Sequence, residues 1–117
     1  MKPLLTLCMM VKDEAHTIAR TLRSAKPHVD RWCILDTGST DGTRDVIETE
    51  MAGVEGWTFN ASFEDFATTR NRLLSIASDP PMSEFLLLLD ADDILEGGEA
   101  LLSWLTAEIE EARAVPE

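Results

Sequence analysis

The stretch Phe85-Leu86-Leu87-Leu88-Leu89-Asp90-Ala91-Asp92-Asp93 decides the fold class of this sequence. Its short, continuous apolar run is typical of a strand that is buried on both faces, as in a parallel sheet. The first polar side chains after the run are carboxylates, which therefore lie at the carboxyl end of the strand. Parallel sheets bind their ligands in the crevice at that edge, so the stretch predicts both a strand and a site.

Three earlier apolar segments repeat this pattern. Leu4–Val11 and Trp32–Leu35 predict buried strands, the second ending in Asp36, and Trp57–Phe59 predicts a short third one. Helical patterns alternate with the strands. We therefore predict an α/β fold, with a mostly parallel sheet of about four strands and helices on both faces.

The expected helices have recognisable boundaries. The first opens at Asp13 or Glu14 and ends at Pro27, and the second runs from Thr43 to Met51, with Asp41 or Thr43 as its cap. We expect Gly53 and Gly56 to close the second helix. The third runs over residues 63–77 and stops at residues 78–81, and the last follows residues 97–98 with Trp104 on its apolar face.

The composition limits the class of protein. With 117 residues the chain is one domain, residues 1–117, and its net charge of −12 argues against nucleic acid and against anionic membranes. Cys8 and Cys33 lie inside apolar runs and predict buried thiols of a reducing compartment. No apolar stretch reaches the ~20 residues of a membrane span. We expect a cytoplasmic protein without a transmembrane segment.

Asp90 and Asp92 are two residues apart, so in an extended segment their side chains share one face. Two neighbouring carboxylates repel each other unless a cation lies between them, and Mg²⁺ and Mn²⁺ prefer oxygen ligands. The alternative is that Asp92 or Asp93 only caps the last helix.

A second polar segment follows the second strand, over residues 36–42. Asp36 is suited to accept hydrogen bonds from a base or a ribose, and Gly38 and Ser39 allow a ligand to approach the backbone. The alternative is a loop that only caps a helix. The segment matches neither the dinucleotide fingerprint nor the P-loop.

Arg70, with Arg44 and Arg72 as further candidates, offers the cation that a diphosphate requires. The alternative for each of them is a solvated surface arginine.

Four segments in order resemble the inverting family 2 glycosyltransferases, which have the GT-A fold. The segments are residues 6–14, 35–43, 66–71 and 88–93, within a similarity that runs from about Leu4 to about Leu95. The first departs from the common Pro-x-Tyr-Asn-Glu pattern, with Met10 and Lys12 at the proline and tyrosine positions. This variant is similar to a bacterial subgroup that is sometimes fused to helical repeats.

The resemblance implies a site for a nucleotide-diphosphate sugar, with uracil as the usual base. Val11, Lys12 and Glu14 would line the nucleotide pocket, and Asp36 would contact the base, with Gly38 and Ser39 also binding the nucleotide sugar. Arg70 would lie near the diphosphate, Asp90 would approach the ribose, and Asp92 would coordinate Mn²⁺ or Mg²⁺. The transferred sugar and the acceptor stay unassigned.

Family members carry an acceptor site and a carboxylate general base well beyond the D-x-D motif. The sequence names no such base, so we expect a truncated Rossmann-like half that supplies donor and metal binding. Alternatives are an inactive nucleotide-binding or assembly fragment, a receiver-like Mg²⁺-binding signalling domain suggested by Asp13 and Glu14, and a haloacid-dehalogenase-type phosphatase, whose Gly-Thr after the second Asp is missing. An exposed sheet edge would also promote self-association.

Overall fold

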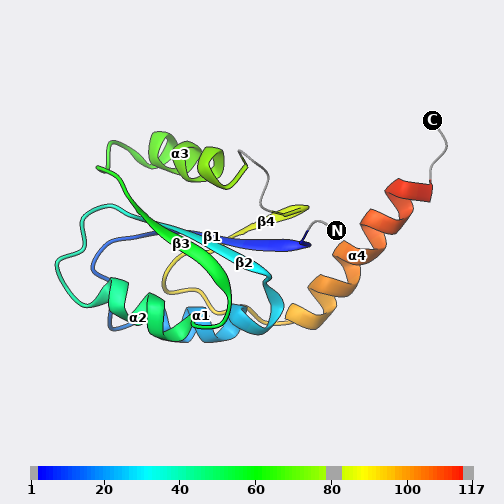
Figure 1. The fold of residues 1–117 in the computed structure, drawn as a ribbon, viewed down its shortest axis with the longest axis horizontal. Helices are drawn as coiled ribbons and strands as arrows, with labels where there is room; N and C mark the ends of the chain where they lie inside the picture. The colour runs from blue at the N-terminus through cyan, green and yellow to red at the C-terminus, as the bar shows by residue number, and fades with distance from the viewer. Residues whose placement is uncertain (1–2, 79–82, 115–117) are drawn as a thin grey trace.

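The computed structural model describes residues 3–78 and 83–114, which form a four-stranded parallel sheet with helices on both faces (Figure 1). The sheet has the order β3-β2-β1-β4 and consists of β1 (Leu5–Val11), β2 (Arg31–Asp36), β3 (Glu55–Asn60) and β4 (Phe85–Leu88). The helices are α1 (Ile18–Ala25), α2 (Thr43–Glu50), α3 (Phe66–Ser78) and α4 (Gly98–Ala114), and a 3₁₀ turn (Lys26–His28) follows α1. All three strand pairings are parallel, which confirms the predicted fold class.

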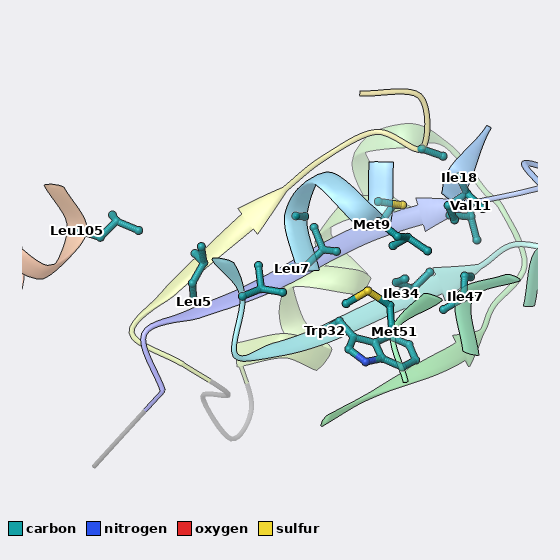
Figure 2. Close-up of a cluster of buried hydrophobic side chains, with 14 residues drawn as sticks. Leu5, Leu7, Met9, Val11, Ile18, Trp32, Ile34, Ile47, Met51 and Leu105 are labelled. Atoms are coloured by element: carbon teal, nitrogen blue, oxygen red, sulfur yellow. The ribbon is translucent and has the colours of Figure 1, made fainter. Parts of the chain in front are cut away.

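Alternate residues of β1 point to opposite sides of the sheet, and both sides are covered. Leu5, Leu7 and Met9 pack with Ile18 of α1 and Ile47 of α2 in the larger core cluster (Figure 2). The smaller cluster, on the side of α3, contains Cys8, Cys33, Leu35, Leu73 and Ala77. Burial on both faces explains why β1 reads as a continuous apolar run and not as an alternating one.

Cys8 and Cys33 are opposite each other in the register of β1 and β2, and both are free, buried thiols. Burial raises the pKa of Cys8 to about 12, with the neighbouring Cys33 adding to the rise, and burial raises the pKa of Cys33 to about 11. Both side chains are therefore uncharged and belong to the core, as the sequence predicts.

The first helix begins later than predicted. Asp13 has φ 53° and Glu14 starts a turn, so α1 begins only at Ile18. Asp13 cannot join a right-handed helix in this conformation, which is why the predicted start was wrong. Pro27 lies in the 3₁₀ turn, past the end of α1.

Gly56 does not close the second helix, because it lies within β3. A Cβ atom at Gly56 would be 2.3 Å from the indole ring of Trp32, whose Nε1–H donates a hydrogen bond to the Val54 carbonyl at 2.8 Å. The residue is therefore a glycine because a tryptophan from β2 occupies the space.

The C-terminal helix α4 extends away from the sheet and the other helices (Figure 1). Leu105 is buried, whereas Trp104, which was predicted on the apolar face of this helix, is 59% exposed. The predicted stop of the third helix falls partly on residues 79–82, which lie outside the described residues. Within the described ranges, no helix has the length and apolar character that crossing a membrane requires.

Candidate functional site

A cleft of about 700 Å³ lies at the carboxyl edge of the sheet, beside the ends of β1 and β4. Six residues that the sequence predicts for the site line it: Val11, Lys12, Glu14, Arg70, Asp90 and Asp92. Its other lining residues are Met10, Thr37, Phe63, Phe66, Leu88, Leu89 and Ala91. The topology explains this convergence, since parallel strands bring their carboxyl ends to one edge.

The acidic turn, residues 90–93, closes on itself after β4. The Asp90 N–H donates to Asp93 Oδ2 at 3.0 Å, and the Asp93 N–H donates to the Asp90 carbonyl at 3.0 Å. Helix α1 holds the turn in place, because the Thr21 hydroxyl donates to the Ala91 carbonyl at 2.8 Å. The turn is thus fixed by contacts within itself and with a helix 70 residues earlier in the chain.

The position of α4 excludes the helix-cap interpretation of these carboxylates. Since α4 begins at Gly98, neither Asp92 nor Asp93 caps it. Carboxylate oxygens of Asp90, Asp92 and Asp93 lie within 4.8 Å of one another, and all three residues are exposed. Ligands of Mg²⁺ on opposite sides of the ion are about 4.2 Å apart, so a small movement of the side chains would fit them to a divalent ion.

The segment after β1 is fastened to the loop after β2. Asp13 Oδ1 accepts the N–H groups of Thr40 at 2.7 Å and Asp41 at 3.3 Å, while the Asp13 N–H donates to Ser39 Oγ at 2.9 Å. The Glu14 N–H donates to Thr43 Oγ1 at 2.9 Å. These contacts fix the backbone on both sides of Asp13, where Lys12 and Glu14 line the cleft.

Asp41 completes this connection between the two segments. It accepts hydrogen bonds from the Thr43 hydroxyl and the Thr43 N–H, and these lower the pKa of its carboxyl group. The Ala15 N–H donates to its second oxygen at 3.3 Å. Gly42 is the residue at the N-cap position of α2, so neither Asp41 nor Thr43 occupies it, but Asp41 binds the first N–H of the helix.

Asp36 ends β2 and is only 2% exposed. Its Oδ1 accepts the N–H groups of Gly38 at 2.8 Å and Ser39 at 2.7 Å. Its Oδ2 is buried and has no hydrogen-bond partner within residues 3–78 and 83–114. Asp36 pairs with Val11 in the sheet and precedes Thr37, and both of these neighbours line the cleft. A buried carboxylate oxygen without a hydrogen-bond donor lowers the stability of the fold. This oxygen is therefore a candidate to accept a hydrogen bond from a ligand.

Gly38 and Ser39 do not line the cleft. Their backbone N–H groups instead hold the carboxylate of Asp36, and the Ser39 hydroxyl holds the segment after β1. Gly38 has φ 122°, a conformation that few other residues adopt. The structure therefore shows Gly38 and Ser39 in contacts that support the loop, and a contact of either residue with a ligand stays a prediction.

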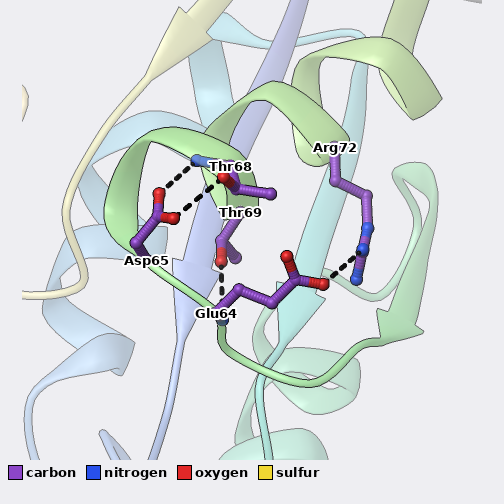
Figure 3. A network of polar contacts seen from close by, with 5 residues as sticks. All are labelled: Glu64, Asp65, Thr68, Thr69 and Arg72. Atoms are coloured by element: carbon purple, nitrogen blue, oxygen red, sulfur yellow. Dashed lines mark hydrogen bonds and ion pairs between the residues drawn. The ribbon is translucent and has the colours of Figure 1, made fainter.

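A network of polar contacts fixes the start of α3 (Figure 3). Asp65 accepts the Thr68 N–H at 2.7 Å and its hydroxyl at 3.0 Å, and these bonds lower the pKa of the Asp65 carboxyl. Arg72 forms an ion pair with Glu64 at 3.1 Å.

The three candidate arginines therefore differ. Arg72 is paired with Glu64, and Arg44 donates to the Asn60 side chain at 3.0 Å. Arg70 lines the cleft and has no ion-pair partner among the residues that the structure describes. Of the three, Arg70 is the one placed to meet an anionic ligand.

This chain is similar to known proteins over most of its length. A family model described as "Glycosyl transferase family 2" matches residues 6–114. A TPR repeat-containing protein of Synechococcus elongatus is 40% identical over 102 residues, which are 86% of this chain and 24% of that protein. The chain thus spans about a quarter of the length of this curated relative.

Two solved structures show the same fold. S. aureus TarS in complex with UDP has a TM-score of 0.72 at 23% identity, covering 95% of this chain and 32% of TarS. M. tuberculosis glucosyl-3-phosphoglycerate synthase in complex with Mn²⁺, UDP and glucosyl-3-phosphoglycerate has a TM-score of 0.62 at 18% identity. It covers 92% of this chain and 39% of that one. These similarities confirm the GT-A type of α/β fold.

Proposed function

This chain belongs to glycosyl transferase family 2, and from that premise we propose that it binds the nucleotide diphosphate of a UDP-linked sugar donor. The observation that supports this most strongly is the cleft, which unites two cationic side chains with the acidic turn at one sheet edge. We propose that the site is the donor half of a glycosyltransferase.

The base contact is assigned to Asp36. Its buried, unpartnered Oδ2 is suited to accept the ring N–H of a uracil, whereas the adenine ring has no such donor. Gly38 and Ser39 support this contact by holding the other oxygen in place. We therefore assign them a positioning role.

The diphosphate contact is assigned to Lys12 and Arg70. The cleft lining carries these two cations against three carboxylates, Glu14, Asp90 and Asp92, which leaves it with one net negative charge. A nucleotide diphosphate adds further negative charge, so its binding requires a counter-ion. We assign Asp92, with Asp90 and Asp93 beside it, to Mn²⁺ or Mg²⁺. Such an ion, when bound, would neutralise the diphosphate as a leaving group.

The reaction that fits this site is a direct displacement. An acceptor hydroxyl oxygen bonds to the anomeric carbon while the bond from that carbon to the diphosphate oxygen breaks. The electron pair leaves with the diphosphate, and the hydroxyl proton passes to a general base. We assign to this chain the leaving-group side of the reaction: residues that bind the donor, orient it and receive the departing charge.

Calorimetric titration with UDP in the presence of Mn²⁺ tests the proposal. We expect the wild-type chain to bind, and Asp36→Asn and Asp92→Asn each to weaken binding about ten-fold or more, since each removes a charged contact. Asp45→Asn is the matched control, because this exposed carboxylate lies on α2 and is absent from the cleft lining. Absence of binding by the wild type, or equal affinity in all four proteins, would contradict the proposal.

A further inference from the structure

Two phenylalanines form an aromatic pair in the cleft and lie outside both core clusters. Phe63 is 47% exposed and Phe66 is 69% exposed, and both line the cleft. Their ring centroids are 5.1 Å apart and the rings are inclined by 77°, which is an edge-to-face arrangement. They are the aromatic members of the cleft lining, in a chain without tyrosine. Apolar rings left in water at a cleft indicate a surface that a ligand covers.

Phe66 is positioned by the first turn of α3. Phe66 is the first residue of α3 and lies one turn before Arg70, so the two share a face of the helix. The contacts of Asp65 with Thr68 hold this first turn in place. The edge-to-face contact with Phe63 leaves Phe66 69% exposed.

We propose that Phe66, supported by Phe63, stacks on the nucleobase of the donor and contributes affinity for its planar ring. This rests on the proposed function, in which Asp36 reads an N–H at the edge of the same base. An edge contact leaves the two faces of the base free, and an aromatic side chain binds such a face. Stacking accepts any base, so Phe66 contributes affinity for a base and Asp36 contributes the choice among bases.

The test compares two ligands that differ in the base. UDP and inorganic pyrophosphate are titrated with Mn²⁺ into wild type, Phe66→Leu and Phe66→Trp. We expect Phe66→Leu to weaken UDP binding about ten-fold and to leave pyrophosphate binding unchanged, while Phe66→Trp retains UDP affinity. Trp57→Leu is the control, since it removes an aromatic side chain that is also 47% exposed but is not part of the cleft lining.

A spectroscopic signature separates stacking from a general loss of structure. With Mg²⁺ in place of the paramagnetic Mn²⁺, the uracil H5 and H6 proton signals should move upfield on binding to wild type. Phe66→Leu should lose that shift while its circular dichroism stays that of wild type.

The outcomes distinguish the inference from its premise. Equal weakening of UDP and pyrophosphate, or unchanged UDP binding in Phe66→Leu, overturns the stacking role and leaves the proposed function intact. Failure of the wild type to bind UDP with Mn²⁺ overturns the proposed function, and the inference with it.

Discussion

Asp13 connects the segment after β1 with the loop after β2. Its left-handed backbone directs its carboxylate to the N–H groups of Thr40 and Asp41, and its own N–H meets the Ser39 hydroxyl. Aspartate tolerates this conformation better than most residues other than glycine. The side chain therefore fixes the backbone of its neighbours Lys12 and Glu14 without lining the cleft itself.

Substitution of Asp13 should separate its backbone role from its side-chain role. We expect Asp13→Ala to lose both, with about ten-fold weaker binding of UDP with Mn²⁺ and about 1–3 kcal/mol lower free energy of unfolding. Asp13→Asn keeps an acceptor oxygen and tolerates the positive φ, so it should stay near wild type. Asp13→Gly relieves the backbone but lacks the acceptor, and should lie between them.

Calorimetry and denaturant unfolding measure these effects. If Asp13→Ala has the UDP affinity and the free energy of unfolding of wild type, the hydrogen bonds of Asp13 contribute to neither.

At the scale of single residues, the sequence predicted six of the side chains that line the cleft, but it did not predict the contacts that each residue makes. Val11, Asp90 and Arg70, which were predicted from strand ends or a motif, all line the cleft. The sequence around Asp13 carries no signal of its positive φ, and no other aspartate within residues 3–78 and 83–114 has a positive φ. The Phe66–Arg70 spacing of one helical turn was visible in the sequence, but a phenylalanine at a helix start reads equally well as core.

The strand β3 depends on a single small residue at its contact with β2. Replacement of Gly56 by alanine would place a Cβ atom 2.3 Å from the indole of Trp32, and that ring is held by its hydrogen bond to Val54. We expect Gly56→Ala to lower the free energy of unfolding by about 1–3 kcal/mol, as overpacking in a core does. Denaturant titration followed by circular dichroism measures it.

Glu55→Ala on the same strand is the control, because Glu55 is exposed and its ion pair with Arg31 is solvent-accessible. Its change should stay within about 0.5 kcal/mol. If Gly56→Ala has the free energy of unfolding of wild type, the indole of Trp32 can move aside without loss of stability, which would contradict the prediction.

The elements were predictable where burial imposes a pattern. β1 and β2 are buried on both faces, so their sequences are continuous apolar runs with recognisable ends. The prediction of burial on both faces was wrong for β4, which lies at the edge of the sheet, is only partly buried and leaves Leu88 41% exposed. Helix boundaries were harder, because they depend on contacts between distant segments. In the sequence, Gly56 is typical of a residue that ends a helix. In the structure it is a glycine because the ring of Trp32, 24 residues earlier, occupies the space of a Cβ atom. The orientation of α4 and the exposure of Trp104 depend on tertiary contacts that no local pattern reveals.

At the scale of the whole molecule, charge is the dominant property. The chain carries a net charge of −12, and the cleft itself has one more carboxylate than cations. A net negative charge disfavours the binding of a nucleotide diphosphate, so the proposed binding would gain from an added cation. The divalent cation proposed for the acidic turn would offset this negative charge where we propose that the donor binds.

Removal of the metal therefore tests the central claim most directly. The affinity for UDP is measured by calorimetry in Mn²⁺, then in excess EDTA, then after Mn²⁺ is restored. We predict a loss on the order of 100-fold in EDTA and full recovery afterwards, with UDP raising the affinity for Mn²⁺ by the same factor, as linkage requires. Equal affinity for UDP with and without metal would contradict a metal-dependent donor site at residues 90–93.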